Sequence, residues 1–272
     1  MKRTLALATI LGVTWAAVAA ADGGGPSPGV SFGSPGLVDA KGKVRYVALP
    51  AGDGTTVAAL RARTGRVLNW GYVHGIYGVP TVAWDGSSAG LARNGRRLVL
   101  TTSASYGIPT RFVVLNPRTL RVRARFTLRG AFAFDALSPG GSLMYLIQFL
   151  GKPNSGRYAV RALNLNTRKL YAGAIVDRRE PEEKMTGQPV TRAESRDGAW
   201  AYTLYGRTNQ GPFVHALDTV HRRAFCVDLP WHSTPRWLGT TRLRVSGGRL
   251  ELHVGRRTMA TVDTHTFEVS RG

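Results

Sequence analysis

The residues that first suggest chemistry lie in the stretch FVHALDTVHRRAFCV, where His215, Asp218 and His221 follow one another at intervals of three. Two imidazoles and a carboxylate at such short range are groups that hold a metal ion or activate a water molecule. In a β-strand, however, residues three apart point to opposite faces of the sheet. Whether these three side chains form a site therefore depends on the elements that position them.

Those elements come from a repeat that runs through the chain. Five segments begin with a turn dipeptide that ends in glycine and continue as a strand rich in β-forming residues. The glycine supplies the positive φ that a tight hairpin turn requires. The segments are KGKVRYVAL (41–49), NGRRLVLTT (94–102), GGSLMYLIQ (140–148), DGAWAYTLY (197–205) and GGRLELHVG (247–255), with their glycines at Gly42, Gly95, Gly141, Gly198 and Gly248.

A second element follows each of these segments and reads as a strand, a turn and another strand. In four of the five copies an Asn or Asp opens the turn, where a short polar side chain accepts hydrogen bonds from the turn backbone. These residues are Asn116, Asn164, Asp218 and Asp263. Each unit thus holds two hairpins and about four strands, repeated about every 50 residues. We therefore predict an all-β fold, a β-propeller of about five four-stranded blades. A two-sheet β-sandwich is the alternative, but it does not explain the period.

The turn sequences SPGG (138–141) and SRDG (195–198), with the later elements LNPRT and LNLNT, resemble the repeats of secreted TolB-like and YVTN-type (WD40-like) β-propeller proteins. The resemblance covers nearly the whole mature chain. It implies a blade and specifies no chemistry. The first and last units are less regular, so it leaves the number of blades and the closure of the ring open.

Aligned with the repeat, the opening motif becomes a structural pattern. His215 occupies the slot that Val113 fills in another unit, Asp218 opens a turn, and His221 stands where the other units carry threonine. We therefore expect no metal and no cofactor at these residues. Cys226 is the only cysteine and occupies an alanine slot, so no disulfide can form within the chain.

The start of the chain indicates export. Residues 1–21 (MKRTLALATILGVTWAAVAAA) combine a basic start, an apolar run and small residues, which is typical of a secretory signal peptide. The Gly-, Pro- and Ser-rich residues 22–36 are predicted to be a linker, and residues 37–272 the propeller domain. We expect a secreted or cell-envelope protein with no transmembrane segment after cleavage. The net charge of +21 attracts polyanions non-specifically, but the basic residues are spread along the chain rather than clustered.

Loops on a rigid scaffold usually carry binding sites. In a blade with strands A to D from the channel outward, the B–C loops and the D–A crossovers share one face, and here they are aromatic and charged. We expect Trp70, Trp84 and Trp237 to pack between blades. The predicted ligand-binding residues are Tyr72, His74 and Tyr77 in residues 69–84, Arg178, Arg179, Lys184 and Arg192 in residues 177–192, and Trp231 and His232 in residues 230–237.

Catalysis is less supported than binding. A glycosidase needs two carboxylates roughly 5 to 9.5 Å apart, and the inner strands offer chiefly Asp135 and Glu194. No nucleophile elbow, zinc motif or phosphate-binding glycine loop is present in the sequence. We predict an exported, non-catalytic and monomeric propeller that binds a glycan, a wall polymer or an envelope protein through its loop-rich face. The alternative is a polysaccharide hydrolase that uses Asp135 and Glu194. Attachment to a polyanion is a third reading, which requires an affinity that falls steeply with salt.

Overall fold

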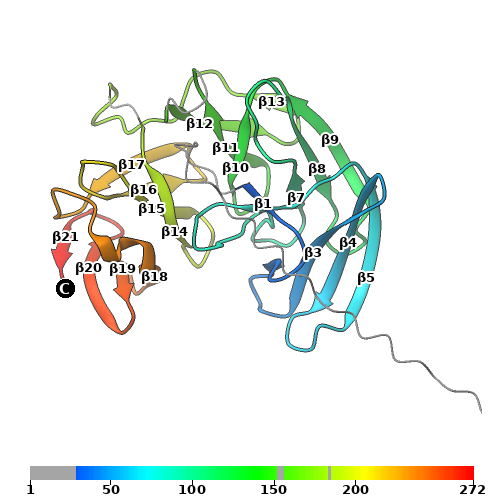
Figure 1. Cartoon of the computed structure of the whole chain (residues 1–272), viewed down its shortest axis with the longest axis horizontal. Coiled ribbons are helices and arrows are strands. Elements are labelled where there is room, and N and C mark those ends of the chain that lie inside the picture. The colour runs from blue at the N-terminus through cyan, green and yellow to red at the C-terminus, as the bar shows by residue number, and fades with distance from the viewer. Residues whose placement is uncertain (1–28, 152–155, 183–184) are drawn as a thin grey trace, which may run out of the picture.

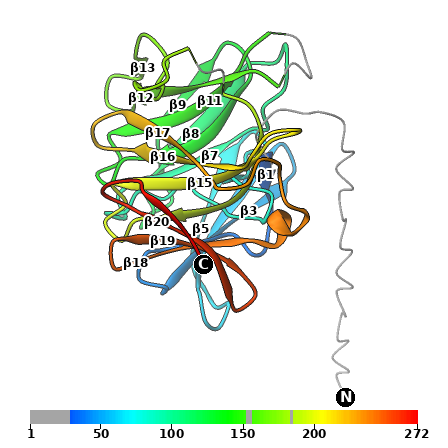
Figure 2. The ribbon, with the colours of Figure 1, turned by 90° about the vertical axis from the view of Figure 1, so that its left-hand side faces the viewer.

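The structure is a ring of antiparallel β-sheets, which confirms the all-β propeller predicted from the sequence (Figure 1). It is a computed structural model that describes residues 29–151, 156–182 and 185–272. The predicted signal peptide lies outside the described residues. Each blade is one continuous stretch of chain, so the sheets follow one another around the ring in sequence order. Figure 2 turns the same ribbon so that blade 5, coloured orange to red, faces the viewer.

Four of the described blades have four strands, whose hydrogen-bonded order is their order in the sequence. Blade 2 has three regular strands, and its innermost strand is split, since Gly78 pairs with Thr101 and Leu91 pairs with Leu98. The strands are β2 (Leu37–Val38), β3 (Val44–Ala51), β4 (Gly54–Arg61) and β5 (Val67–His74) in blade 1; β7 (Leu98–Thr101), β8 (Thr110–Leu115) and β9 (Val122–Leu128) in blade 2; β10 (Phe132–Leu137), β11 (Leu143–Phe149), β12 (Tyr158–Asn164) and β13 (Lys169–Leu170) in blade 3; β14 (Gln188–Glu194), β15 (Trp200–Gly206), β16 (Phe213–Asp218) and β17 (Arg223–Asp228) in blade 4; and β18 (Arg242–Ser246), β19 (Arg249–Val254), β20 (Arg257–Asp263) and β21 (Val269–Arg271) in blade 5.

The turns between the first two strands of each blade contain the glycines of the repeat. All five glycines have φ between 65° and 78°, which confirms the predicted role of glycine at this position. In four blades the glycine N–H donates to the carbonyl three residues earlier, as Gly141 does to Ser138 at 2.8 Å. The five glycines are Gly42, Gly95, Gly141, Gly198 and Gly248.

The turns between the last two strands repeat as well. In blades 2 to 5 the Asn or Asp that opens the turn accepts the N–H two residues later, as Asn116 does from Arg118 at 3.0 Å and Asp263 from His265 at 2.8 Å. This confirms the predicted turn openers. The residue four places after the opener has a left-handed backbone in every blade, yet only blade 1 places glycine there. These residues are Gly65, Leu120, Arg168, Arg222 and Phe267.

Apolar side chains fill the spaces between neighbouring blades. Within the described residues they form four clusters, between blades 1 and 2, 2 and 3, 3 and 4, and 4 and 5. No such cluster joins blade 5 to blade 1 in that part of the chain. The ring is therefore open at this point, as the space between β18 and β3 in Figure 1 shows.

A short hairpin, in which Thr81 pairs with Ser88, crosses the channel on the loop-rich face. β6 (Val79–Thr81) pairs with β1 (Gly29–Ser31), so part of the stretch expected to be a linker belongs to the fold. Beyond β6 the chain reaches blade 4, where the Trp84 N–H donates to the Pro189 carbonyl at 2.9 Å. The channel is thus covered at this end. A hollow of about 320 Å³ remains at the other end, lined by the A–B turns of blades 1, 2 and 4.

Candidate functional site

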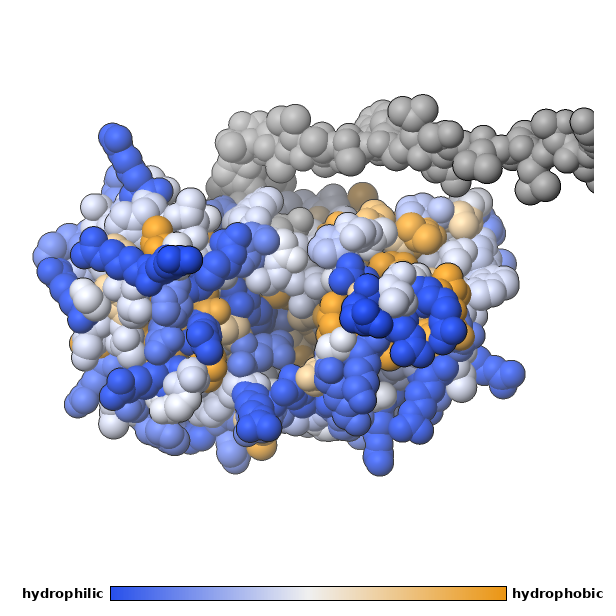
Figure 3. All heavy atoms as spheres, turned by 90° about the horizontal axis from the view of Figure 1, so that it is seen from below, coloured by the Kyte–Doolittle hydropathy of each residue, from blue (hydrophilic) through white to orange (hydrophobic). Residues whose placement is uncertain are grey.

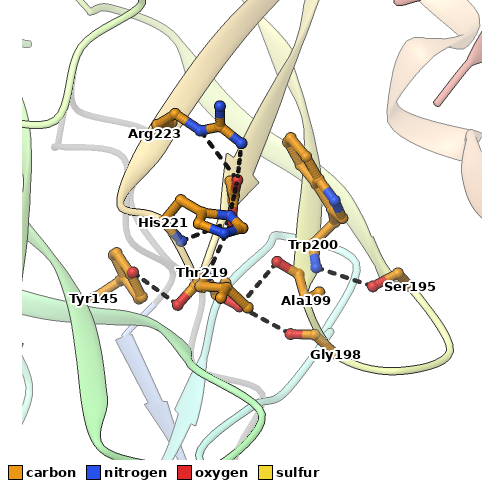
Figure 4. Close-up of polar contacts among 10 residues, drawn as sticks. Tyr145, Ser195, Gly198, Ala199, Trp200, Thr219, His221 and Arg223 are labelled. Atoms are coloured by element: carbon orange, nitrogen blue, oxygen red, sulfur yellow. Dashed lines mark hydrogen bonds and ion pairs between the residues drawn. The ribbon is translucent and has the colours of Figure 1, made fainter. Parts of the chain in front are cut away.

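Two residues of the His215–Asp218–His221 motif meet, since Nδ1 of His221 lies 2.9 Å from the Asp218 carboxylate, but His215 lies elsewhere. Asp218 accepts the N–H groups of Val220 and His221 at 3.0 and 2.9 Å, and the Arg223 guanidinium at 2.7 Å (Figure 4). Burial raises the pKa of Asp218, but these hydrogen bonds outweigh burial and the pKa is lowered. In the described parts of the chain no group of three or more His, Cys, Asp or Glu residues is placed to hold a metal ion.

The same turn ties blade 4 to blade 3. The Tyr145 hydroxyl of blade 3 donates to the Thr219 carbonyl at 2.8 Å, and the Thr219 hydroxyl donates to the Gly198 carbonyl at 2.9 Å (Figure 4). Burial is the main cause that raises the pKa of Tyr145 far above its usual value. The motif is therefore a structural joint between two hairpin turns, as the repeat alignment predicted.

His215 lies apart from that joint, in the core between blades 3 and 4. Its side chain is buried and its Nε2 has no partner among the described residues. The pKa of His215 is lowered from 6.5 to about 4, mainly by burial; Asp135 and Asp177 oppose the shift and Arg192 adds to it. The imidazole is consequently neutral at neutral pH.

Asp135 and Arg192 form a buried ion pair beside this histidine. The Arg192 Nη1 donates to the Asp135 carboxylate at 2.7 Å, and the two side chains are 4% and 7% exposed for Arg192 and Asp135 respectively. The prediction of Arg192 as a ligand-binding loop residue is therefore wrong, since it lies on the inner strand β14. Asp135 is committed to the guanidinium, whereas Glu194 lines the hollow. The two carboxylates of the hydrolase alternative therefore lie in different surroundings.

The other charged and aromatic candidates are scattered. Arg179 pairs with Asp177 at 2.6 Å and lies over the Phe225 ring, while Arg178 is exposed. Lys184 lies outside the described residues. In the next crossover His232 is exposed, and Trp231 packs edge to face on Trp237 with ring centroids 5.0 Å apart. Trp237 thus packs as predicted, against the cluster between blades 4 and 5.

Tyr77 requires a correction. It is 6% exposed and belongs to the cluster between blades 1 and 2, because the chain turns inward after β5 and its backbone N–H binds the buried Thr55 hydroxyl at 2.8 Å. The prediction of Tyr77 as an accessible ligand contact is wrong. The prediction that Trp70 packs between blades is also wrong, since its side chain is 65% exposed. Trp84 is also exposed and donates to Gln188 at 3.0 Å.

Trp70, Tyr72 and His74 lie together because β5 is a regular strand. The sequence suggested a crossover loop, but alternation along β5 places all three side chains on one face of blade 1. Trp70 pairs with Ala58, which pairs with Val47, and Tyr72 stands beside Thr56 in the same way. Blade 2 covers the opposite face of the sheet. We call this side, which no other blade covers in the described part of the chain although Val47 and Ala58 on it are buried, the outer face of blade 1.

Asp53 organises the exposed end of that face. Its carboxylate accepts hydrogen bonds from the Tyr72 hydroxyl and from Nδ1 of His74, the latter at 3.3 Å. The hydrogen bond from Tyr72 is the main cause that lowers the pKa of Asp53. The Tyr72 and His74 rings meet edge to face with centroids 5.3 Å apart. The three side chains thus form a fixed, solvent-facing cluster.

Leu49 completes the face and was missed by the sequence reasoning. It is 43% exposed and lies on β3, where register places it beside Thr56 and hence on the side of Tyr72. The period-two order of Trp70, Tyr72 and His74 was a signal for the strand. Nothing local distinguished Leu49 from a core residue.

No protein-family model and no curated protein matches the sequence. Solved structures of β-propellers resemble the fold at low identity. A Cps50 (Swd1) β-propeller domain from Myceliophteria thermophila aligns at 12% identity and a TM-score of 0.49, covering 91% of this chain and 71% of that one. A putative TolB from Agrobacterium tumefaciens aligns at 12% identity and a TM-score of 0.48, and the alignment covers 89% of this chain and 80% of that one. BamB from Moraxella catarrhalis aligns at 18% identity and a TM-score of 0.41, and the alignment covers 82% of this chain and 62% of that one.

Proposed function

We propose that this chain is an exported, non-catalytic propeller that binds an envelope protein through the outer face of blade 1. The observation that carries the proposal is that, within the described residues, no neighbouring blade packs on this sheet face. Trp70, Tyr72 and Leu49 are 65%, 42% and 43% exposed on it, whereas each of the four other blade junctions buries its apolar residues. Exposed apolar surface of this kind marks interaction sites, and Trp and Tyr are the side chains that most often anchor protein partners.

Export is part of the proposal. It rests on the signal-peptide pattern of residues 1–21. Among the described residues there is no helix long and apolar enough to span a membrane. Sequencing the N-terminus of the protein recovered outside the cytoplasm tests this part, because cleavage near Ala21 is expected.

A glycan ligand is the second candidate, and one observation favours it. Asp53, Tyr72 and His74 form a preorganised set of hydrogen-bonding groups next to the exposed Trp70 ring. A carboxylate and an imidazole beside an aromatic face bind hydroxyl groups and the apolar side of a sugar ring. This site would use the exposed end of the face and would not need Leu49.

The two candidates are separated by matched variants. Tagged wild-type protein is incubated with the extracytoplasmic proteins of its own cells, and retained proteins are quantified by mass spectrometry. We expect at least one protein to be retained by the wild type and by the control I108A, an exposed position on blade 2, and lost with L49A/W70A. The same proteins are then applied to a glycan array, where D53N should abolish binding if a sugar is the ligand.

The variants L49A/W70A, D53N and I108A change exposed side chains, so we expect each of them to fold like the wild type. Retention that is equal for L49A/W70A and I108A would exclude the outer face as a protein-binding surface. Array binding that is lost in D53N and unaffected by L49A would establish the glycan function instead. Absence of both effects would refute the proposal.

A further inference from the structure

The opening of the ring lies between two sheet faces of different character. No hydrogen bond or ion pair between blade 1 and blade 5 is found in the described residues. Seen from below the view of Figure 1, the molecule shows a recess between two lobes; apolar surface is exposed on both lobes and is more extensive on the right-hand lobe, which carries blade 1 (Figure 3). The recess is bounded by the outer face of blade 1 and by the face of blade 5 that points away from blade 4.

The wall on blade 1 is apolar and contains a groove. The groove has a volume of about 380 Å³, and Val47, Leu49 and Leu60 line it. Arg45 lies at the same groove and is half-buried, and its Nε has no partner among the described residues. A partner that fills this groove meets one guanidinium in an otherwise apolar setting.

The wall on blade 5 is polar, with two exposed arginines and a glutamate that contacts His253 at 2.9 Å. Leu250 and Leu252 of β19 pack against blade 4, so the alternate residues of the sheet face the opening. Arg244 pairs with Glu251 across the sheet and is exposed. The side chain of Arg242 is 60% exposed, and its Nε lies 3.8 Å from the Asp85 carboxylate, which is a long distance for an ion pair.

We propose that the opening between blades 5 and 1 receives a β-hairpin of an acidic protein partner. The apolar side of the hairpin packs on the outer face of blade 1, and its carboxylates meet Arg242 and Arg244 on blade 5. A sheet element is the expected shape because the other face of blade 1 is already covered by a sheet, that of blade 2. This inference rests on the proposed function and adds the chemistry of the partner.

A second copy of the chain is the wrong occupant on grounds of charge. The net charge is +21, so two copies repel each other. The exposed face of blade 5 offers Arg242 and Arg244 rather than apolar residues to the blade 1 of another copy. An acidic partner satisfies both walls at once.

The probes are three disulfide-closed peptides of equal length measured by fluorescence anisotropy on the purified protein. The first is a hairpin with Val and Ile on one face and Glu on the other, the second replaces Glu by Lys, and the third is a scrambled sequence of the acidic one. We expect the acidic hairpin to bind with a Kd below about 100 μM. The lysine hairpin should not bind, and the scrambled peptide should bind at least about tenfold more weakly.

Two variants, one on each wall, and one control decide the geometry. L49E and R244E should each weaken the acidic hairpin at least about tenfold, and I108E should leave its affinity unchanged. Thermal unfolding of each variant confirms that the fold is retained. If L49E weakens binding and R244E does not, the docking between two walls is refuted while protein binding by blade 1 stands. Equal binding of the scrambled peptide reveals polyanion attraction only, and no binding of the hairpin overturns the inference.

Discussion

Replacement of His215 by phenylalanine should remove most of the pH dependence of stability between pH 7 and pH 5. The buried imidazole has a pKa of about 4 in the folded protein against 6.5 in the unfolded chain. Between these values the unfolded chain binds a proton that the folded protein does not, so stability falls as the pH falls. The contribution of this one group is a loss of about 2 kcal/mol from pH 7 to pH 5 and about 3 kcal/mol at pH 4.

The assay is urea unfolding followed by tryptophan fluorescence at pH 7, 6 and 5. The carboxylates whose pKa is lowered by the fold, including Asp177 and Asp218, contribute stability that is lost mainly below their unfolded value of 3.8. The range from pH 7 to 5 therefore isolates histidine. The phenylalanine ring keeps the flat shape that packs edge to face on Tyr205. H265F, at an exposed position on blade 5, is the matched control.

An unchanged slope in H215F would refute the reasoning, because it would mean that the imidazole is not held neutral in the folded protein. If H265F lost the pH dependence of stability to the same extent, the effect could not be assigned to the His215 imidazole. The titratable and charged groups that act on His215 are Asp135, Arg192 and Asp177. None of them changes in either variant, so the comparison measures the imidazole alone.

Three further predictions concern the turns and the buried pair. R168G should stabilise the protein by about 1 kcal/mol in urea unfolding, because Arg168 is exposed with a φ of 59° that costs a residue with a side chain about that much. Y145F should destabilise it by about 1 to 3 kcal/mol, since the buried Thr219 carbonyl loses its donor, and an unchanged midpoint would contradict the joint between blades 3 and 4. D135N should cost about 3 to 5 kcal/mol by leaving Arg192 buried without its counter-charge, and a variant as stable as the wild type would show that the ion pair is not formed.

The repeat could be predicted from the sequence because its turns depend on local chemistry. A positive φ favours glycine, and a turn whose backbone N–H groups point inward favours Asn or Asp. The turn positions of Gly141 and Asn116 can therefore be predicted from the local sequence alone. The left-handed residues four places after each Asx, such as Leu120, were not recognisable. These residues are leucine, arginine and phenylalanine, because the surrounding hairpin imposes a positive φ even where the residue type disfavours it.

The opening of the ring could not be predicted, because it depends on which faces meet. Along β3 the alternation of Tyr46, Val47, Ala48 and Leu49 predicts a strand with two apolar sides, as in any inner blade. Only the position of blade 5 decides that the side of Leu49 stays uncovered. The hairpin that carries Trp84 across the channel is equally non-local, since its contacts lie more than 100 residues away.

The composition of the two walls explains why the chain does not close its own ring. Closure would press Arg244 and Glu251 of blade 5 onto the side of blade 1 that carries Leu49 and Trp70. Burying such charges against apolar side chains costs several kcal/mol per ion unless partners come with them. A face-to-face contact of the kind that joins the other blades is therefore unfavourable here. In the proposed complex a third element buries the apolar wall and brings carboxylates to the arginines, which removes this cost.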